Sequence, residues 1–318
     1  MVRVAINGFG RIGRTFFRLA HNNPDFEVVA VNDLGDLANL AYLLEYDSVY
    51  GRSPFSVSQK DGKMLIQGKE VSFLQEREPA KLPWKDLNID IVIESTGFFT
   101  TYECAKLHID AGAKRVVVSA PMKGGIGTDG ATVLMGVNAG VLATCQVSSN
   151  ASCTTNATSP LIAILKETIG IEKAVLNTVH AYTASQSLVD GPSKKDIREG
   201  RAAALNIVPS TTGAAIATTL AHPELTDKFD GIAMRVPVPV GSIVDVTFIA
   251  KRDTSVEEVN KILADAAKDP RWKNLFAATN EPIVSSDIIG SRVGSIADLS
   301  FTKVVGGNLV KVLAWYDN

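Results

Sequence analysis

The segment Gly8-Phe9-Gly10-Arg11-Ile12-Gly13 follows an apolar run, Val2–Ile6, and opens an amphipathic stretch, Arg11–His21. It matches the pattern G-x-G-x-x-G at the place where a strand should end and a helix should begin. In such a turn the first glycine allows a tight bend, the second lets the backbone approach a pyrophosphate, and the third lets helix and strand pack closely. The helix N-terminus then favours the anion. The segment therefore predicts a dinucleotide-binding unit.

Asp33 stands twenty residues after Gly13, just beyond a second apolar run, Val28–Val31. An acidic side chain at this place can accept hydrogen bonds from a ribose and repel a 2′-phosphate. We therefore expect NAD rather than NADP as the cofactor. The alternative is a structural turn with an incidental aspartate.

Apolar runs and helix-like stretches alternate through the first half of the chain. Strands are expected at Val2–Ile6, Val28–Val31, Ile89–Glu94 and Arg115–Ser119, and helices at Arg11–His21, Asp36–Glu45 and Tyr102–Ala111. Strands separated by helices of this length are typical of βαβ units on a parallel sheet. Turn signals in Pro54–Phe73 predict a small antiparallel excursion. Residues 1–152 should therefore form an α/β Rossmann-type dinucleotide-binding domain.

The pattern changes after about Ser152. Long apolar runs predict strands at Lys173–Thr183, Gly231–Val238, Ile243–Lys251, Leu299–Val305 and Asn308–Tyr316, with helices at Cys153–Thr168, Thr212–Ala221 and Ser255–Lys268. These favour an α+β domain with a large mixed or antiparallel sheet. A length of 318 residues also suggests two domains. We expect the second, catalytic domain at residues 153–318.

Composition excludes several classes of protein. Lys+Arg 32 against Asp+Glu 34 leaves a net charge of -2, which gives no general attraction to nucleic acid or membranes. The chain is 46% hydrophobic, enough to build cores. We find no run near the roughly 18 apolar residues that span a bilayer, and a first strand at Val2 leaves no room for a signal peptide. We expect a cytoplasmic protein without nucleic-acid or membrane partners.

One of the three cysteines lies in an unusual setting, the octet Ser149-Asn150-Ala151-Ser152-Cys153-Thr154-Thr155-Asn156. Ser152 can cap the helix that follows and so place Cys153 in the first turn, where the helix dipole stabilises a thiolate. We expect a low pKa for this thiol and a nucleophilic role. The alternative, a buried small apolar side chain, is preferred for Cys104 and Cys145. The spacing of the three predicts neither a disulfide nor a metal site.

His180, one of only four histidines, ends the apolar strand Ala174–Val179. There it could act as a base toward a thiol or a substrate hydroxyl, or be a satisfied structural histidine. The residues themselves leave both interpretations open.

Groups that bind anions gather in the second half. Ser210-Thr211-Thr212-Gly213 precedes an alanine-rich helix and offers a phosphate site of the helix N-terminal kind. Arg235 lies inside an apolar strand and needs a compensating anion, either a protein carboxylate or a ligand phosphate. Arg198 and Arg201 lie in a polar loop, where solvent exposure and ligand contact are equally plausible.

Together these motifs resemble the phosphorylating, glycolytic glyceraldehyde-3-phosphate dehydrogenases, from Val2 to Asn318. The octet around Cys153 is the most specific landmark. The others are Ile6 to Arg14, Glu94-Ser95-Thr96-Gly97, His180-Ala181-Tyr182-Thr183, Thr212-Gly213-Ala214-Ala215, Arg235-Val236-Pro237 and Trp315-Tyr316-Asp317-Asn318.

The resemblance implies a specific reaction. Cys153 would attack the aldehyde of glyceraldehyde 3-phosphate to form a thiohemiacetal, and His180 would assist as a base. Hydride would pass to NAD⁺, and inorganic phosphate would attack the thioester to release 1,3-bisphosphoglycerate. The family is usually homotetrameric, so we expect a homotetramer.

The resemblance also implies the binding residues. The substrate phosphate would be held by Thr183, Arg198 and Arg235, and the attacking phosphate by Ser152, Thr154, Thr212 and Gly213, with Arg198 able to serve either phosphate. The glycine loop Gly8, Gly10 and Gly13 with Arg11 and Ile12 would hold the pyrophosphate, Asp33 the adenosine ribose, Arg77 the adenine, and Thr96, Ser119 and Asn318 the nicotinamide end.

Two rival functions fit parts of this pattern. Erythrose-4-phosphate dehydrogenases share the octet but lack the combination of His180-Ala181-Tyr182-Thr183 with Thr211-Thr212-Gly213, so they rank second. A non-catalytic NAD-binding interaction protein would not need Cys153, His180 and two phosphate pockets. Members of the family normally continue past Trp-Tyr-Asp-Asn with a helix that packs on the nucleotide domain. We therefore expect the natural chain to extend beyond Asn318 and its last residues to return toward the first domain.

Overall fold

The computed structural model describes residues 1–123, 130–194 and 196–318, which divide into two compact units. The first unit spans Met1–Val133 and Gly140–Ala151, and the second Leu134–Ala139 and Ser152–Asn318. Compared with the expected division at 152/153, Ser152 and a short earlier segment join the second unit. That segment lies there because Gly136 packs against the Trp272 ring and its carbonyl accepts a hydrogen bond from Arg271, 2.7 Å away.

The first unit is built on a nine-stranded sheet of the described residues, in the order β10-β11-β9-β8-β1-β2-β7-β6-β5. Its strands are β1 (Val2–Asn7), β2 (Phe26–Asn32), β5 (Val57–Lys60), β6 (Lys63–Ile66), β7 (Lys69–Leu74), β8 (Ile91–Glu94), β9 (Arg115–Val118), β10 (Gly130–Thr132) and β11 (Val147–Ser149); β3 (Tyr46–Asp47) and β4 (Gly51–Arg52) pair separately. Strands β10 through β7 are parallel, whereas β5, β6 and β7 pair antiparallel. The predicted parallel sheet and its antiparallel excursion are confirmed.

Apolar side chains cover both faces of this sheet, as a parallel sheet requires. Successive residues of β1 point to opposite faces: Ala5 packs with Trp84, and Ile6 packs with Phe17. Helix α3 (Tyr102–Asp110) contributes to the first cluster, while α1 (Arg11–Ala20) and α2 (Leu37–Glu45) contribute to the second. A short 3-10 turn, η1 (Pro79–Lys81), precedes β8.

The second unit holds a seven-stranded sheet in the order β13-β14-β12-β15-β18-β17-β16. Its strands are β12 (Ile171–Ala181), β13 (Val208–Thr211), β14 (Phe229–Val236), β15 (Ser242–Ala250), β16 (Phe276–Thr279), β17 (Ser295–Val305) and β18 (Leu309–Tyr316). The β12–β14 and β16–β17 pairs are parallel and the others antiparallel, so the predicted mixed sheet is confirmed. The short strands β13 and β16 were not predicted, because four residues carry too little periodicity.

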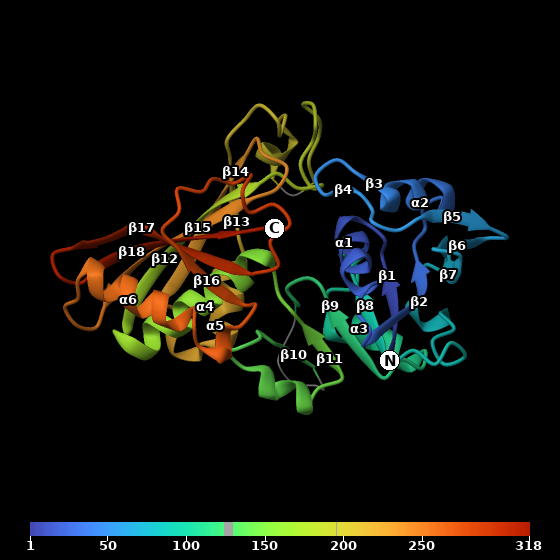
Figure 1. The fold of residues 1–318 in the computed structure, drawn as a ribbon, viewed down its shortest axis with the longest axis horizontal. Helices are drawn as coiled ribbons and strands as arrows, with labels where there is room; N and C mark the ends of the chain where they lie inside the picture. Colours follow the sequence, from blue (N-terminus) through green and yellow to red (C-terminus); the bar gives the residue numbers. More distant parts are fainter. Residues whose placement is uncertain (124–129, 195) are drawn as a thin grey trace. The chain divides into compact units, whose positions relative to one another are not determined.

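Three helices cover one face of this sheet (Figure 1). They are α4 (Cys153–Thr168), α5 (Ala214–Ala221) and α6 (Val256–Ala266). Four further 3-10 turns lie elsewhere in the described chain: η2 (Ala139–Ala143), η3 (Ile197–Gly200), η4 (Pro223–Leu225) and η5 (Pro270–Trp272). Leu161 of α4, Leu263 of α6 and Val246 of β15 belong to one buried cluster. From Ala174 onward, the even residues of β12 therefore face the helices, as do the even residues of β15.

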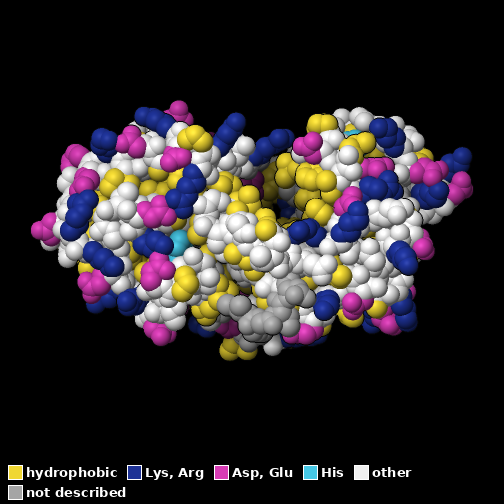
Figure 2. Space-filling view, turned by 90° about the horizontal axis from the view of Figure 1, so that it is seen from below, with side chains coloured by type: hydrophobic (Ala, Val, Ile, Leu, Met, Phe, Trp, Pro, Cys, Tyr) yellow, Lys and Arg dark blue, Asp and Glu magenta, His cyan; other side chains and the backbone are white. Residues whose placement is uncertain are grey.

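The surface shows no gathering of one charge on the face drawn in Figure 2, where Lys and Arg side chains are interspersed with Asp and Glu. None of the helices in the described ranges is long and apolar enough to cross a membrane. The same ranges contain no cluster of His, Cys, Asp and Glu that could hold a metal ion.

His222, at the end of α5, is a buried titratable group with 1% of its surface exposed. Its Nδ1 lies 3.2 Å from Lys166 Nζ and its Nε2 3.3 Å from Ser159 Oγ. An ammonium group can only donate, so Nδ1 accepts and Nε2 carries the proton. Burial and the charge of Lys166 lower the pKa of His222 to about 4.

We expect the His222→Gln variant to lose less stability in acid than the wild type. Between about pH 6.5 and 4 this histidine is protonated in the unfolded state but stays neutral in the folded state. The free energy of unfolding therefore falls as the pH drops through this range. Urea unfolding at pH 7.5 and 4.5 should show a wild-type loss greater by about 2 kcal/mol. Equal losses in the two proteins would contradict the prediction.

Candidate active site

Cys153 is the first residue of α4. The Ser152 hydroxyl accepts a hydrogen bond from Thr155 N at 3.1 Å, so the predicted N-cap is confirmed. Just before it, Ala151 has φ +57°, a left-handed conformation that few residues other than glycine adopt. This sharp turn sets the thiol at the open end of the helix, where it is partly exposed.

The structure brings Cys153 and His180 together: Sγ lies 3.4 Å from Nε2. On the other side of the ring, Nδ1 lies 2.6 Å from Ala181 O and 2.5 Å from Arg235 Nη1. These two contacts require opposite tautomers, because the carbonyl only accepts and the guanidinium only donates. Only the tautomer whose Nδ1–H donates to Ala181 O leaves a lone pair on Nε2 to take the thiol proton.

Arg235 reaches this site because the parallel register of β12 and β14 pairs it with His180. Its Nε is buried and has no hydrogen-bond partner in the described part of the chain. Nor do the described residues provide it with a carboxylate partner, which was one of the two alternatives left by the sequence. A buried, unsatisfied N–H is costly, so the site is suited to an incoming anion.

Burial controls the protonation of this pair. It raises the pKa of the Cys153 thiol above its ordinary value; the hydrogen bonds of Thr154 and the charge of Arg235 lower the pKa only in part. The low thiol pKa expected from the helix N-terminus is therefore wrong for this structure, because desolvation of the thiolate outweighs the hydrogen bonds that the first helical residues offer it. Burial and Arg235 also lower the pKa of His180 to about 4. The pair is thus a neutral thiol beside a neutral imidazole at neutral pH.

Tyr316, whose role could not be predicted from the sequence, packs against the His180 ring and binds the hydroxyl of Thr154, the residue after Cys153. Its hydroxyl lies 2.8 Å from both Thr154 Oγ1 and Thr178 Oγ1, and its ring meets His180 edge-on at 5.9 Å. Burial raises the pKa of Tyr316, which keeps it neutral. Alternation along the last strand could have predicted that the residue is buried, but not which partners it has.

The other predicted anion-binding residues lie on separate loops of the second unit. Thr183 Oγ1 is 3.0 Å from Ser185 Oγ, and Arg198 forms an ion pair with Asp196 at 2.7 Å. Gly213 is the N-cap of α5, and Thr212 Oγ1 accepts a hydrogen bond from Ala214 N at 3.2 Å. Among the contacts found between described residues, none joins these side chains to Cys153.

The glycine loop of the first unit has the form expected for a pyrophosphate. A Cβ on Gly13 would lie 2.1 Å from Gly8 O, so only glycine lets α1 pack this close to the turn. By contrast, a Cβ on Gly10 would meet nothing within 4 Å. Arg11 and Ile12 are the first residues of α1, and Gly10 has no side chain to cap their N–H groups. Because no acceptor for these groups is found among the described residues, they can bind an anion.

The other predicted cofactor residues stand at the carboxyl ends of neighbouring parallel strands. Asp33 follows β2, and its carboxylate accepts from Phe9 N at 2.6 Å. Thr96 follows β8, and Ser119 follows β9 and donates to Glu94 O at 3.1 Å. This edge, where the sheet order reverses around β1, is where open α/β sheets bind ligands.

Arg77 follows β7, which pairs in parallel with β2 and ends at the same edge, and its side chain is exposed. Asn318 belongs to the second unit, where its Oδ1 accepts from Gly241 N at 3.1 Å and from Ser242 Oγ at 2.8 Å. The open first turn of α1 and the acceptor at Asp33 nevertheless suit a dinucleotide.

Comparison with known proteins agrees with this arrangement. Residues 2–102 match the family model "Glyceraldehyde 3-phosphate dehydrogenase, NAD binding domain", and residues 152–318 match the model for the C-terminal domain. The chain is 50% identical to a glyceraldehyde-3-phosphate dehydrogenase of Thermotoga maritima, over all of this chain and 95% of that protein. It is 49% identical to one of Streptomyces coelicolor, over all of this chain and 94% of that protein, and 48% identical to one of Geobacillus stearothermophilus, over all of this chain and 93% of that protein. The chain therefore belongs to the glyceraldehyde 3-phosphate dehydrogenase family.

Proposed function

We propose that Cys153 is the nucleophile and His180 the proton acceptor in the oxidation of glyceraldehyde 3-phosphate with NAD and inorganic phosphate. The reaction and its cofactor follow from the family to which the chain belongs. The residue assignment rests on one contact, the 3.4 Å between Cys153 Sγ and His180 Nε2. A nucleophile within reach of a base is the arrangement that covalent catalysis needs.

The protons can be followed through each step. His180 Nε2 takes the thiol proton as Sγ attacks the aldehyde carbon, and returns it to the aldehyde oxygen to give the thiohemiacetal hydroxyl. Bound NAD⁺, held by the glycine loop and Asp33, would supply the acceptor for the hydride of that carbon. His180 takes the hydroxyl proton as the thioester forms. A phosphate oxygen then bonds to the acyl carbon and gives up its proton to solvent, the C–S bond breaks, and His180 returns its proton to the departing Cys153 thiolate.

The raised pKa of the Cys153 thiol makes a proton acceptor such as His180 necessary for the attack on the aldehyde. A thiol with a raised pKa yields little thiolate by itself at neutral pH, so a neutral imidazole must take its proton as attack proceeds. The backbone N–H of Cys153, the first residue of α4, would donate a hydrogen bond to the developing oxyanion.

The binding roles are proposed on the same basis. Arg235, whose Nε lacks a partner among the described residues, would hold the substrate phosphate with Thr183 and Arg198. The attacking phosphate would lie against Ser152, Thr154, Thr212 and Gly213. NAD would be held by Gly8, Gly10, Arg11, Ile12, Gly13, Asp33, Arg77, Thr96, Ser119 and Asn318.

The two rival functions are not favoured. The relatives described above all carry the glyceraldehyde-3-phosphate dehydrogenase name rather than that of an erythrose-4-phosphate enzyme. The close approach of Cys153 and His180 supports catalysis over a purely interacting role.

We also propose that the protein is a homotetramer of the cytoplasm. On the face of the second sheet opposite the helices, Val175 is 61% and Ile232 48% exposed. The loop after β12 exposes Leu188, Ile197 and Leu205 as well. Apolar surface of this extent favours association with further copies of the chain. All three cysteines are free, which is typical of a reducing compartment.

Turnover provides the direct test of the residue assignment. We expect Cys153→Ser to abolish NADH formation and His180→Asn to slow it by roughly 10²- to 10⁴-fold, because the first removes the nucleophile and the second the base. Activity should require phosphate or arsenate and favour glyceraldehyde 3-phosphate over erythrose 4-phosphate. An active serine variant, or turnover independent of the oxyanion, would contradict the proposal.

The charge of Arg235 should set the pH at which Cys153 reacts. Arg235 lowers the thiol pKa, so Arg235→Gln should move the alkylation profile to higher pH, whereas Arg235→Lys keeps the charge and should shift it less. Iodoacetamide rates from pH 6 to 10, with the label located on Cys153 by peptide mass, provide the measurement. Identical profiles in the two variants would count against the role of the charge.

Sedimentation velocity tests the assembly. A single species of about four times the 33.9 kDa chain mass is expected at micromolar concentration, and Ile197→Asp should reduce its proportion because a carboxylate is costly to bury. A wild-type monomer would exclude the proposed tetramer.

A further inference from the structure

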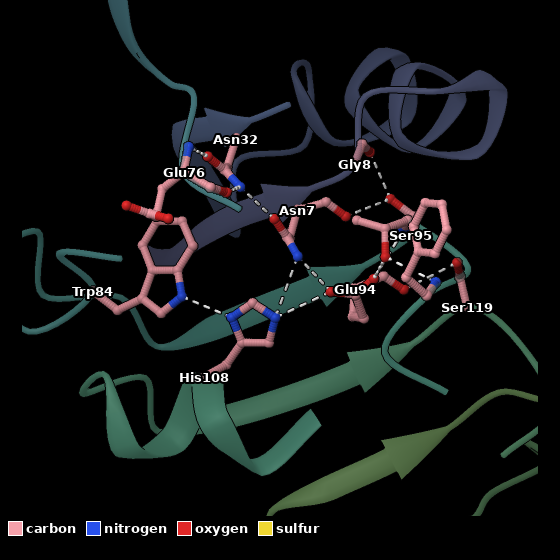
Figure 3. Close-up of polar contacts among 11 residues, drawn as sticks. Asn7, Gly8, Asn32, Glu76, Trp84, Glu94, Ser95, His108 and Ser119 are labelled. Atoms are coloured by element: carbon pink, nitrogen blue, oxygen red, sulfur yellow. Dashed lines mark hydrogen bonds and ion pairs between the residues drawn. The ribbon is translucent and has the colours of Figure 1, made fainter. Parts of the chain in front are cut away.

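Polar side chains end three neighbouring strands of the first unit. Asn7 ends β1, Asn32 ends β2 and Glu94 ends β8. The parallel register pairs Asn7 with both of the others, so the three side chains lie in a row. None is more than 3% exposed. With Trp84 and His108, which are fully buried beside them, they form what we call the strand-end network (Figure 3).

One end of the network has a fixed direction. Trp84 Nε1 lies 2.9 Å from His108 Nδ1, and His108 Nε2 lies 3.0 Å from Glu94 Oε2. An indole N–H can only donate, so Nδ1 accepts and the ring proton sits on Nε2, from which it is donated to Glu94. Figure 3 shows the His108 ring between the indole and the carboxylate. Trp84 therefore sets the tautomer that Glu94 requires.

Both carboxylate oxygens of Glu94 accept hydrogen bonds. Oε2 also accepts from Asn7 Nδ2 at 2.5 Å, and Oε1 accepts from Thr96 N at 2.8 Å and Thr96 Oγ1 at 2.5 Å. Four donors match the acceptor sites of a carboxylate. The Thr96 hydroxyl proton is thereby committed to Glu94.

The network holds the turn that carries the first glycine. Thr96 N would lie 2.6 Å from a Cβ on Gly8, so the two backbones are in direct contact. Ser95 Oγ also donates to Gly8 O at 2.7 Å. Any shift of Thr96 away from Glu94 must therefore disturb the glycine loop.

The other end of the network reaches two more cofactor loops. Asn32 Nδ2 donates to Asn7 Oδ1 at 2.6 Å, and Asn32 Oδ1 accepts from Glu76 N at 2.8 Å. Asn32 is followed by Asp33, and Glu76 by Arg77. One chain of hydrogen bonds thus links four segments proposed to bind NAD.

We propose that Trp84, His108 and Glu94 are positioning residues for NAD: without touching the cofactor, they hold Thr96 and the Gly8 turn in the conformation that binds it. The substitution His108→Leu would leave Glu94 short of one donor and the Trp84 N–H without an acceptor. A buried carboxylate tolerates such a loss poorly, and the Thr96 segment it holds is free to move.

Three variants test the proposal on the full chain. His108→Leu removes donor and acceptor, whereas His108→Gln can supply both. Val116→Ala is the matched control: Val116 is buried in the same apolar cluster as Trp84, and its side chain has no hydrogen-bonding group. Truncating it therefore lowers stability without removing a hydrogen bond of the network. NAD dissociation constants are measured by calorimetry at a temperature where each variant is folded.

We expect His108→Leu to weaken NAD binding roughly 5- to 100-fold, the range for an unsatisfied buried polar group, and His108→Gln to restore most of it. Val116→Ala should bind NAD like the wild type despite a lower melting temperature. Alkylation of Cys153 without NAD should be unchanged in all three. Equal weakening in His108→Leu and Val116→Ala, or failure of glutamine to restore binding, would overturn the proposal.

A second measurement needs no variant to remain folded. Solid-state ¹⁵N NMR of histidine-labelled wild type should show His108, one of four histidines, as the neutral Nε2–H tautomer. A proton on Nδ1, or a charged ring, would overturn the proposal. The inference takes NAD as the cofactor: a wild type that does not bind NAD would refute the proposed function, whereas a wild type and a His108→Leu variant that bind it equally would refute only the positioning role.

Discussion

The contact between Cys153 Sγ and His180 Nε2, 3.4 Å long, is the constraint around which the second unit is built. It exists because α4 begins at Cys153 under a serine cap, while β12 delivers His180 at its carboxyl end. The parallel pairing of β12 with β14 then brings Arg235 against the same ring. A slip of one residue in that register would turn the guanidinium to the other face of the sheet.

Burial gives this contact its chemical character. The same desolvation raises the thiol pKa and lowers the imidazole pKa, so both groups rest in their neutral forms. An imidazole that is neutral and adjacent can accept a proton when the thiol attacks, which is the condition for base-assisted nucleophilic catalysis. Arg235 adds positive charge at the place where we propose that the substrate phosphate binds.

The two units use one structural device. In each, polar side chains sit at the carboxyl ends of parallel strands: His180 and Arg235 in the second, Asn7, Asn32 and Glu94 in the first. Strand ends hold such groups well because the strand fixes the backbone while the last side chain lies beside an open loop. In the first unit these groups hold the loops that follow the strands, whereas in the second His180 contacts the Cys153 thiol and Arg235 contacts the His180 ring.

The sequence by itself determined the parallel sheet, the mixed sheet, the glycine turn and the cap at Ser152. Each of these depends on local periodicity or on the conformation of a few adjacent residues. Only the tertiary structure decided the thiol pKa, the role of Tyr316 beneath Thr154, and the link from Trp84 through His108 to Glu94. Those features depend on strand register and on burial, which bring together residues far apart in the chain. The local sequence predicts that Glu94 ends a strand, but only the tertiary structure shows which donors surround its carboxylate.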